Sequence, residues 1–138
     1  MKSLRLIFTL LALSFVGQSW AEVAIIVHPS NNSSVSQTDL TRMFLGKLKS
    51  FPGGGAVVPV NLPEGDSTTD EFNEKVLSKS ASQLKAYWSK LVFTGKGTPP
   101  KTAASADEML TLVANNPNLI GYVDASKVNG SVKVIAKF

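Results

Sequence analysis

The sequence of 138 residues contains no cysteine and a single histidine, His28. Without cysteine there can be no disulfide framework, no thiol nucleophile and no thiolate metal ligand. One imidazole without thiolates also argues against a zinc site. A serine nucleophile would have to use His28 as its base, and the sequence has no GxSxG, HExxH, P-loop or GxGxxG motif. We therefore expect no catalytic residue, no metal site and no cofactor.

An excess of charge of one sign is also missing. Fourteen Lys and Arg stand against ten Asp and Glu, which gives a net charge of +4. Without Lys2 and Arg5, which lie in a predicted leader, twelve basic residues stand against ten acidic ones. The basic residues beyond position 40 are scattered, with no dense run and no basic–aromatic repeat. This pattern predicts no nucleic-acid partner.

Long hydrophobic runs are absent too. The longest one, Leu6–Val16, has 11 residues, whereas a membrane-spanning helix needs about 20. Two basic residues precede it, and the small residues Ser19 and Ala21 follow. This order is typical of a secretory signal peptide. We predict that residues 1–21 are removed by cleavage after Ala21; the alternative is an uncleaved membrane anchor.

The predicted mature chain, residues 22–138, is long enough for one hydrophobic core. Because it has no cysteine for lipid attachment, we expect it to be free in the periplasm and not inserted in a membrane. Strands are predicted at 23–27, 56–62, 119–123 and 132–135, the last two around a turn at Asn129-Gly130. Pro59 predicts that the second strand is interrupted or lies at an edge. The residues 93–101, rich in Gly and Pro, are predicted to form a loop.

Helix starts are marked by hydroxyl side chains that can accept a hydrogen bond from the first turn. Ser36 can cap one helix, and the capping-box pattern recurs at Thr68-x-x-Glu71, Ser80-x-x-Gln83 and Ser105-x-x-Glu108. Strands that alternate with helices predict an α/β domain with a central mixed sheet flanked by helices.

Apolar residues at helical spacing predict which helix faces are buried. The third and fourth predicted helices carry two such sets, Leu84, Tyr87, Trp88 and Leu91, then Met109, Leu112 and Val113. The pair Tyr87-Trp88 could serve as a platform for a sugar or a partner, but its place among leucines favours core packing.

Five carboxylates cluster at Glu64, Asp66, Asp70, Glu71 and Glu74. They lack the loop spacing of an EF-hand. Two of them fit the first turn of a helix, where negative charge stabilises the helix dipole. A calcium site is therefore not expected here.

Several short motifs together resemble a known family. They are Phe44-Leu45-Gly46-Lys47, Val57 to Val60, Phe72, Tyr87-Trp88, Phe93-x-Gly95-x-Gly97-x-x-Pro100 and Asn116-Pro117-x-x-Ile120-Gly121-Tyr122-Val123. In this order the chain resembles the phosphate-type substrate-binding proteins of ABC importers over nearly all of residues 22–137. The run that ends in Ile120-Gly121-Tyr122 is the most specific part.

The resemblance implies a single lobe of the type II periplasmic-binding-protein-like fold and a non-enzymatic role. In that family two lobes close on an oxyanion, which backbone amides and hydroxyls at a helix N-terminus hold together with an arginine and an aspartate. The corresponding hydroxyls here are Ser67, Thr68 and Thr69, at a helix start whose dipole favours an anion. The glycine of the family's Ser-Gly-Thr is replaced, and the family's arginine has no counterpart.

No Lys or Arg occurs from Ser50 to Glu74, so a cation would have to come from Lys96 or Lys101 in the following loop. A single lobe would also leave half of the ligand in water, which weakens charge-assisted hydrogen bonds. A homodimer or a different envelope protein could cover the open face. Two hypotheses follow: a protein that binds a small inorganic oxyanion such as phosphate, or an exported interaction module on the same fold that has lost small-ligand binding.

Overall fold

The computed structural model describes residues 21–138. The predicted leader therefore lies, except for Ala21, outside the described residues. Within residues 21–138, no helix combines the length and the apolar character that a membrane span requires.

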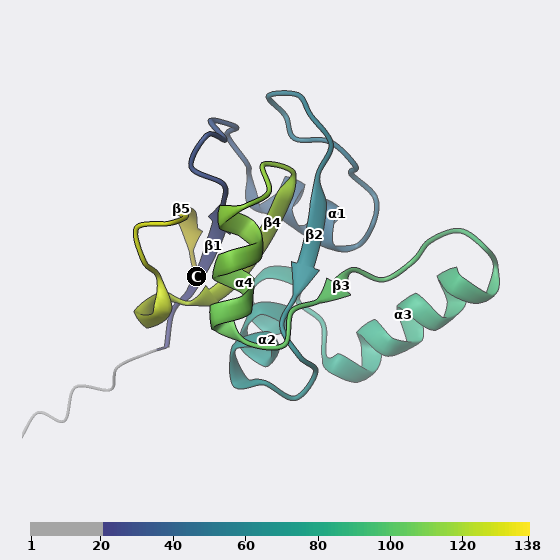
Figure 1. Ribbon diagram of the computed structural model, residues 1–138. Helices are drawn as coiled ribbons and strands as arrows, with labels where there is room; N and C mark the ends of the chain where they lie inside the picture. Colours follow the sequence, from purple (N-terminus) through teal and green to yellow (C-terminus); the bar gives the residue numbers. More distant parts are fainter. Residues whose placement is uncertain (1–20) are drawn as a thin grey trace, which may run out of the picture.

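A mixed sheet of five strands forms the centre of the molecule (Figure 1), as the sequence predicts. Its strands lie in the order β3-β2-β4-β1-β5. They are β1 (Val23–Val27), β2 (Val58–Asn61), β3 (Lys101–Thr102), β4 (Leu119–Asp124) and β5 (Lys133–Lys137). β1 is antiparallel to both of its neighbours, whereas β2 is parallel to β3 and to β4.

The strand β1 is buried along its whole length, as its continuous apolar run predicts for a central strand. It pairs with β4 in a register that places Ile25 opposite Tyr122. On its other side it pairs with β5, with an irregularity between Ile25 and Ile26. The last two strands of the chain, predicted around Asn129-Gly130, are thus separated in the sheet by β1.

The strand β2 is shorter than the predicted range of 56–62. It contacts each neighbour through only two residue pairs, and Pro59 lies opposite Ile120 of β4. Proline cannot donate a ladder hydrogen bond, which accounts for the brevity of the pairing. The edge position itself belongs to β3, whose residue Lys101 was expected in a loop.

The helices are α1 (Gln37–Phe44), α2 (Ser67–Phe72), α3 (Ala81–Phe93) and α4 (Ala106–Ala114), with a π-helical turn η1 (Asn73–Leu77) and a 3₁₀ turn η2 (Ala125–Lys127). Ser36 and Ser80 form reciprocal capping boxes, and Ser105 accepts a hydrogen bond from the Glu108 amide. These three predicted helix starts are confirmed. The hydroxyl caps are local features, so the sequence alone can indicate them.

α2 begins at Ser67, one of the two predicted start residues, but its cap differs from the prediction. Its N-cap is Asp66, whose carboxylate accepts a hydrogen bond from the Thr68 amide at 2.8 Å, so the predicted box Thr68-x-x-Glu71 is wrong. α2 continues directly into η1, which ends at Ser78 with a left-handed φ of 53°. Ser78 is the one non-glycine residue with positive φ among residues 21–138. The turn at this residue directs the chain into α3.

Two faces of the sheet are covered by different helices (Figure 1). On β4, a side chain at Gly121 would overlap the sulfur of Met109 in α4, whereas the ring of the next residue, Tyr122, stacks on Phe72 of α2. Because neighbouring residues of a strand point to opposite faces, α4 covers one face and α2 the other. Phe44 of α1 lies beside Phe72, with ring centroids 4.7 Å apart.

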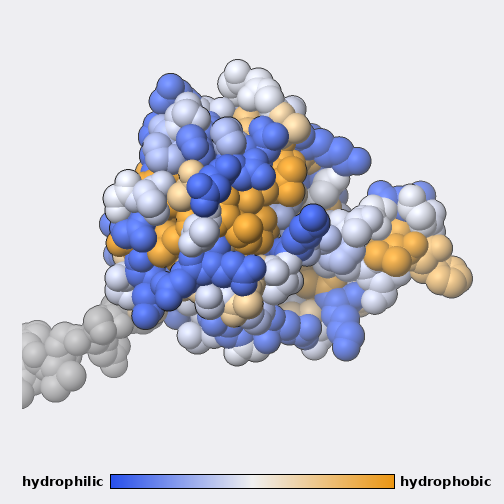
Figure 2. Space-filling model, viewed as in Figure 1, coloured by the Kyte–Doolittle hydropathy of each residue, from blue (hydrophilic) through white to orange (hydrophobic). Residues whose placement is uncertain are grey.

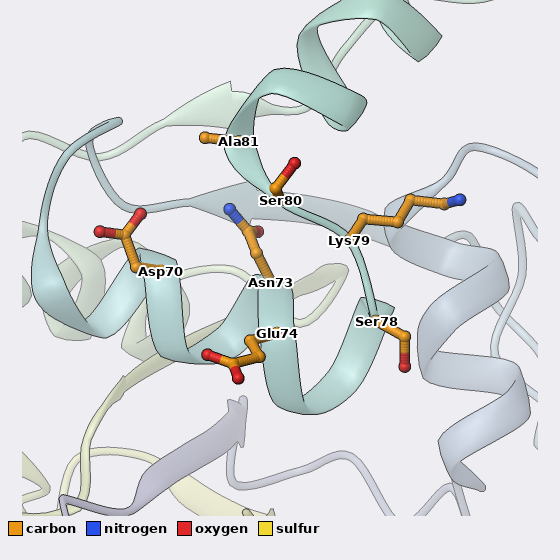
Figure 3. Close-up of a pocket in the computed structure, with 7 residues that line it drawn as sticks. All are labelled: Asp70, Asn73, Glu74, Ser78, Lys79, Ser80 and Ala81. Carbon is orange, nitrogen blue, oxygen red and sulfur yellow. The ribbon is translucent and has the colours of Figure 1, made fainter.

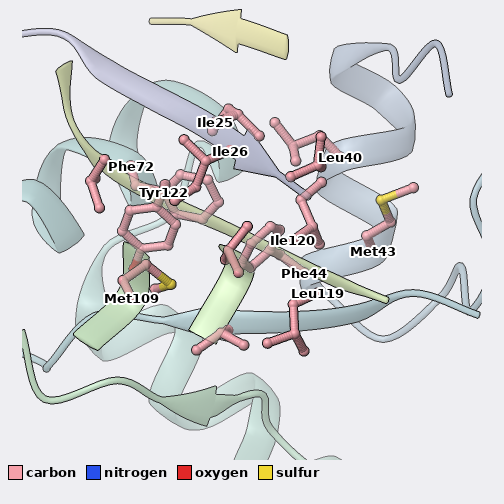
Figure 4. Packing of buried hydrophobic residues seen from close by; sticks show 14 of the residues in the cluster. Ile25, Ile26, Leu40, Met43, Phe44, Phe72, Met109, Leu119, Ile120 and Tyr122 are labelled. Atoms are coloured by element: carbon pink, nitrogen blue, oxygen red, sulfur yellow. The ribbon is translucent and has the colours of Figure 1, made fainter. Parts of the chain in front are cut away.

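This aromatic cluster of Phe44, Phe72 and Tyr122 forms the centre of the core (Figure 4), and all three residues are fully buried. In α4, Leu110 is buried together with Met109 and Val113. The predicted Leu112 is instead partly exposed, so the inward face of this helix is rotated by part of a turn from the predicted one.

The helix α3 projects from the body, and the loop that follows it returns to β3 (Figure 1). We call residues 81–100 the α3 arm. None of the residues in α3 is buried. Leu84 and Tyr87 are half-buried and pack against the core as predicted. Trp88 and Leu91 are half-buried without joining the core, so the core packing predicted for Trp88 is wrong. At the tip of the arm, Phe93 is 92% exposed and Val92 54% exposed.

Candidate functional site

The start of α2 holds the three predicted hydroxyl residues in different surroundings. Ser67 is exposed, Thr68 is half-buried and Thr69 is buried. The Thr69 hydroxyl donates a hydrogen bond to the Pro63 carbonyl at 2.8 Å, so it points into the protein. The Thr68 amide is already bonded to Asp66. Of the predicted hydroxyls, Ser67 is therefore the most accessible to a ligand.

The electrostatics of this helix start oppose an anion. Asp66 caps α2 and Asp70 lies in its first turn. A like charge within about 5 Å of a phosphate would cost on the order of 1 to 3 kcal/mol at an effective dielectric of about 20. Asp66 thus occupies the position at which the helix dipole would stabilise an external anion.

The two predicted lysines do not join this helix start in one pocket. Lys96 lines a separate cleft whose walls include none of the residues 67–69. Lys101 is exposed in β3, where it pairs with Val60 of β2. Among residues 21–138 the one ion pair is Lys75 with Glu71, at 3.6 Å, and it lies at the other end of α2.

Lys96 instead contributes to a cleft between the α3 arm and the segment that follows α1. The cleft has a volume of about 660 Å³, and three of its lining residues are lysines, Lys47, Lys49 and Lys96. No acidic residue lines it. We call it the lysine cleft. Sequence reasoning did not assign Lys47 or Lys49 to a site, although Lys47 is the last residue of the motif Phe44-Leu45-Gly46-Lys47.

Aromatic residues form one wall of the lysine cleft. Tyr87 and Trp88 of α3 pack edge to face, with ring centroids 5.1 Å apart, and both line the cleft. The Tyr87 hydroxyl donates a hydrogen bond to the Leu45 carbonyl at 2.6 Å, which ties the arm to the body. Gly46 has a φ of 74°, and a β-carbon there would lie 3.1 Å from the Trp88 ring. Glycine therefore permits both the turn and the close approach of the arm.

A second cleft lies where the arm leaves the body. It has a volume of about 260 Å³ and is lined by apolar side chains that include Leu77, Leu84 and Trp88, with Glu64 and Lys85 also in its walls. We call it the apolar cleft. Thr69 lines it as well, but the Thr69 hydroxyl is engaged by Pro63.

A third hollow, of about 520 Å³, lies beside the π-helical turn (Figure 3). Figure 3 shows Asp70, Asn73 and Glu74 along one continuous helix, with Ala81 at the start of α3. Asp70 and Glu74 bring two of the five clustered carboxylates to this hollow. We call it the acidic hollow.

No group of three or more potential metal ligands gathers within residues 21–138. His28 lies in a local turn, where its Nδ1 is 2.7 Å from the Ser30 hydroxyl and 3.1 Å from the Ser30 amide. This arrangement stabilises the loop after β1 and brings no acid or nucleophile from another element to the ring.

Burial raises the pKa of Tyr122 to about 12, an effect opposed by a hydrogen bond from the Leu62 amide and by one with Thr69. The Tyr122 hydroxyl lies 3.2 Å from the Asn61 side-chain oxygen, to which it donates. Since Asn61 lines the apolar cleft, Tyr122 connects the core to that cleft as a neutral hydrogen-bond donor.

Comparison with known proteins finds similar solved structures, whereas no family model and no curated protein matches the chain. An ABC-type phosphate transport receptor from Vibrio cholerae matches with a TM-score of 0.65 and 19% identity, over 83% of this chain and 45% of that one. A phosphate ABC transporter substrate-binding protein from Clostridium perfringens, solved with bound phosphate, matches with a TM-score of 0.66 and 22% identity, over 83% and 44%. PstS from Borrelia burgdorferi matches with a TM-score of 0.61 and 10% identity, over 84% and 47%.

The chain therefore spans less than half the length of each of these structures. At such identities the similarity concerns the fold alone. It confirms the architecture that the sequence motifs predict: this chain has the fold of one lobe of the phosphate ABC transporter substrate-binding proteins, of the type II periplasmic-binding-protein-like class.

Proposed function

We propose that this chain is an exported, non-enzymatic protein that binds a small inorganic oxyanion such as phosphate, and that the lysine cleft is its binding site. One observation carries this proposal: Lys47, Lys49 and Lys96 line the same cleft, and no carboxylate does. The fold shared with phosphate-binding proteins supports it.

The sign of the charge favours this cleft over the start of α2. A cleft lined by charge of one sign concentrates ions of the opposite sign. Lysine is a common ligand of phosphate groups, which it recognises as a point charge. At the start of α2, by contrast, Asp66 and Asp70 repel an anion.

We expect the affinity to be modest because all three lysines are exposed. Each exposed charge pair contributes up to about 1 kcal/mol. Three such pairs contribute up to about 3 kcal/mol together, which corresponds to a dissociation constant of roughly 5 mM at low ionic strength. The affinity should fall as salt is added, since exposed charges are screened.

Titration calorimetry of the purified protein with phosphate, sulfate and acetate tests the proposal. Lys47→Gln and Lys96→Gln are each expected to weaken phosphate binding several-fold, because each removes one charge from the cleft. Ser67→Ala should bind like the wild type. Lys127→Gln, on η2, is the matched control for the loss of one positive charge.

The same titration separates the alternatives. If Ser67→Ala abolishes the binding heat and the lysine variants keep it, the start of α2 is the site and the lysine cleft is not. If none of the three anions produces a heat at millimolar concentration, the second hypothesis, an exported interaction module, is favoured. The exposed apolar tip of the α3 arm supports that alternative.

We also propose that residues 1–21 are a cleaved signal peptide and that the mature protein resides in the periplasm without a lipid anchor. Intact-mass measurement of the protein from a periplasmic extract is expected to give the mass of residues 22–138. A full-length mass in the membrane fraction would contradict the proposal and would favour the uncleaved anchor.

A further inference from the structure

Two surfaces of this chain carry opposite charge. The α3 arm contains Lys85, Lys90 and Lys96 and no acidic residue. Residues 64–74 contain five carboxylates and no basic residue. Within the acidic segment Glu71 pairs with Lys75 at 3.6 Å. Figure 1 shows that the arm extends away from the α2 region, and none of the arm's lysines forms an ion pair with the other four carboxylates of the segment.

The end of the arm is apolar. Phe93 is 92% exposed and Val92 is 54% exposed, and Figure 2 shows apolar surface at the end of the projecting arm. An exposed aromatic side chain at the tip of a projecting element is typical of a residue that anchors an interface.

We propose that two copies of this chain pair through their α3 arms, so that the basic, apolar-tipped arm of each copy docks beside the acidic segment of the other. A basic arm with an apolar tip suits a partner that presents an acidic side chain beside an apolar cleft. The apolar cleft of this same chain has Glu64 and leucines in its walls, with Lys85 as its one basic residue, and Glu64 begins the acidic segment. We therefore assign a second copy of this chain as the partner.

The dimensions of the arm fit a symmetric pair. α3 has 13 residues, which corresponds to about 20 Å, and its middle residue is Tyr87. If two α3 helices lie antiparallel about a twofold axis that is level with Tyr87 but on the side of the helix away from Leu45, Phe93 of one copy lies opposite Ala81 of the other. Ala81 lines both the apolar cleft and the acidic hollow. Each Phe93 would thus reach the mouth of the other copy's apolar cleft.

The same arrangement brings opposite charges together. Counted from the same axis, Lys90 of one copy lies opposite Leu84 of the other. Leu84 and Glu64 line one cleft, so this arrangement assigns Glu64 as the acidic partner of Lys90. A twofold axis forms each contact twice, so a single substitution changes two contacts and doubles the effect on the free energy of dimerisation.

This inference is independent of the proposed anion binding. Its tests change Lys90, Phe93 and Glu64, whereas the anion is assigned to Lys47, Lys49 and Lys96. Measurement of the subunit number in a chloride buffer without phosphate or sulfate therefore tests the dimer even if no anion binds.

Size-exclusion chromatography with light scattering over a range of protein concentrations measures the dimer dissociation constant. The wild type is expected to form dimers. Lys90→Glu and Glu64→Lys should each raise the dissociation constant about tenfold or more, because a like-charge contact replaces each of two ion pairs. The double variant with both substitutions should return to within a few-fold of the wild type. Lys127→Glu is the control and should leave the constant unchanged.

Phe93→Ser tests the apolar part of the interface and should give monomers at concentrations at which the wild type is dimeric. Since Phe93 makes almost no buried contact in one copy, this variant is expected to fold normally, which circular dichroism checks. A monomeric wild type, a dimeric Phe93→Ser variant, or a double charge variant that remains weakened would each overturn the proposed interface.

Discussion

Replacement of Phe72 by alanine is expected to lower the free energy of unfolding by about 3–5 kcal/mol, the range for large aromatic truncations in a core. Phe72 has no exposed surface. Its ring stacks on Tyr122 with centroids 3.9 Å apart and an interplanar angle of 4°, and it meets Phe44 edge-on at 4.7 Å. Truncation removes both contacts and leaves a cavity between α1, α2 and β4, which the rigid sheet cannot close.

Phe93→Ala is the matched control because it makes the same chemical change at a residue that is 92% exposed. Its effect on the unfolding free energy of the monomer should stay within about 0.5 kcal/mol. Urea denaturation of both variants at low protein concentration gives the comparison. Equal losses for the two variants would mean that the aromatic cluster is not the centre of the core.

The wild type is expected to lose stability as the pH rises above about 10. Replacement of Tyr122 by phenylalanine should remove most of this pH-dependent loss. Burial raises the pKa of Tyr122 to about 12, above the ordinary tyrosine value of 10.0. The folded protein therefore favours the neutral phenol, whereas the unfolded chain ionises first as the pH rises. The stabilisation is complete below pH 10 and is lost progressively as the pH rises to about 12.

The size of this effect follows from the pKa difference. A difference of about two pH units corresponds to roughly 3 kcal/mol, since one unit is worth about 1.4 kcal/mol. At neutral pH the phenylalanine variant loses about 1–3 kcal/mol, because the Leu62 amide and the Asn61 side-chain oxygen lose their partner. The variant is thus less stable than the wild type at pH 7, and the gap narrows as the pH rises.

Urea denaturation at several pH values from neutral to about 11.5 measures how the difference in unfolding free energy between Tyr122→Phe and the wild type changes with pH. Tyr87→Phe is the control, because it removes a tyrosine hydroxyl but keeps Tyr122. We expect the difference in unfolding free energy between Tyr87→Phe and the wild type to stay constant between pH 10 and about 11.5. A gap between wild type and Tyr122→Phe that does not change with pH would contradict the assignment.

Local features of this fold could be predicted from the sequence. The serine caps at Ser36 and Ser80 depend on residues within four positions, and both were found as predicted. The buried strand β1 was evident from its apolar run. At α2, however, Asp66 and Thr68 can both cap a helix. The turn that precedes α2, with Gly65 at a φ of 87°, places Asp66 in the capping position, which residue type alone does not determine.

Features that depend on distant parts of the chain were not predictable. The apolar periodicity of α3 correctly indicates an amphipathic helix, but it does not show how much of the apolar face the rest of the chain covers. Trp88 is therefore half-buried rather than part of the core. Likewise Lys47 and Lys96 share a cleft only because the arm folds back along the segment after α1, and no local pattern signals that contact.

The outer strands of the sheet have a consequence for behaviour at high concentration. β3 offers only two residues, Lys101 and Thr102, and β5 ends in the exposed Lys137. Short outer strands and lysine side chains at sheet edges discourage the addition of a strand from another molecule. We therefore expect the protein to resist growth into amyloid-type fibrils when it is concentrated.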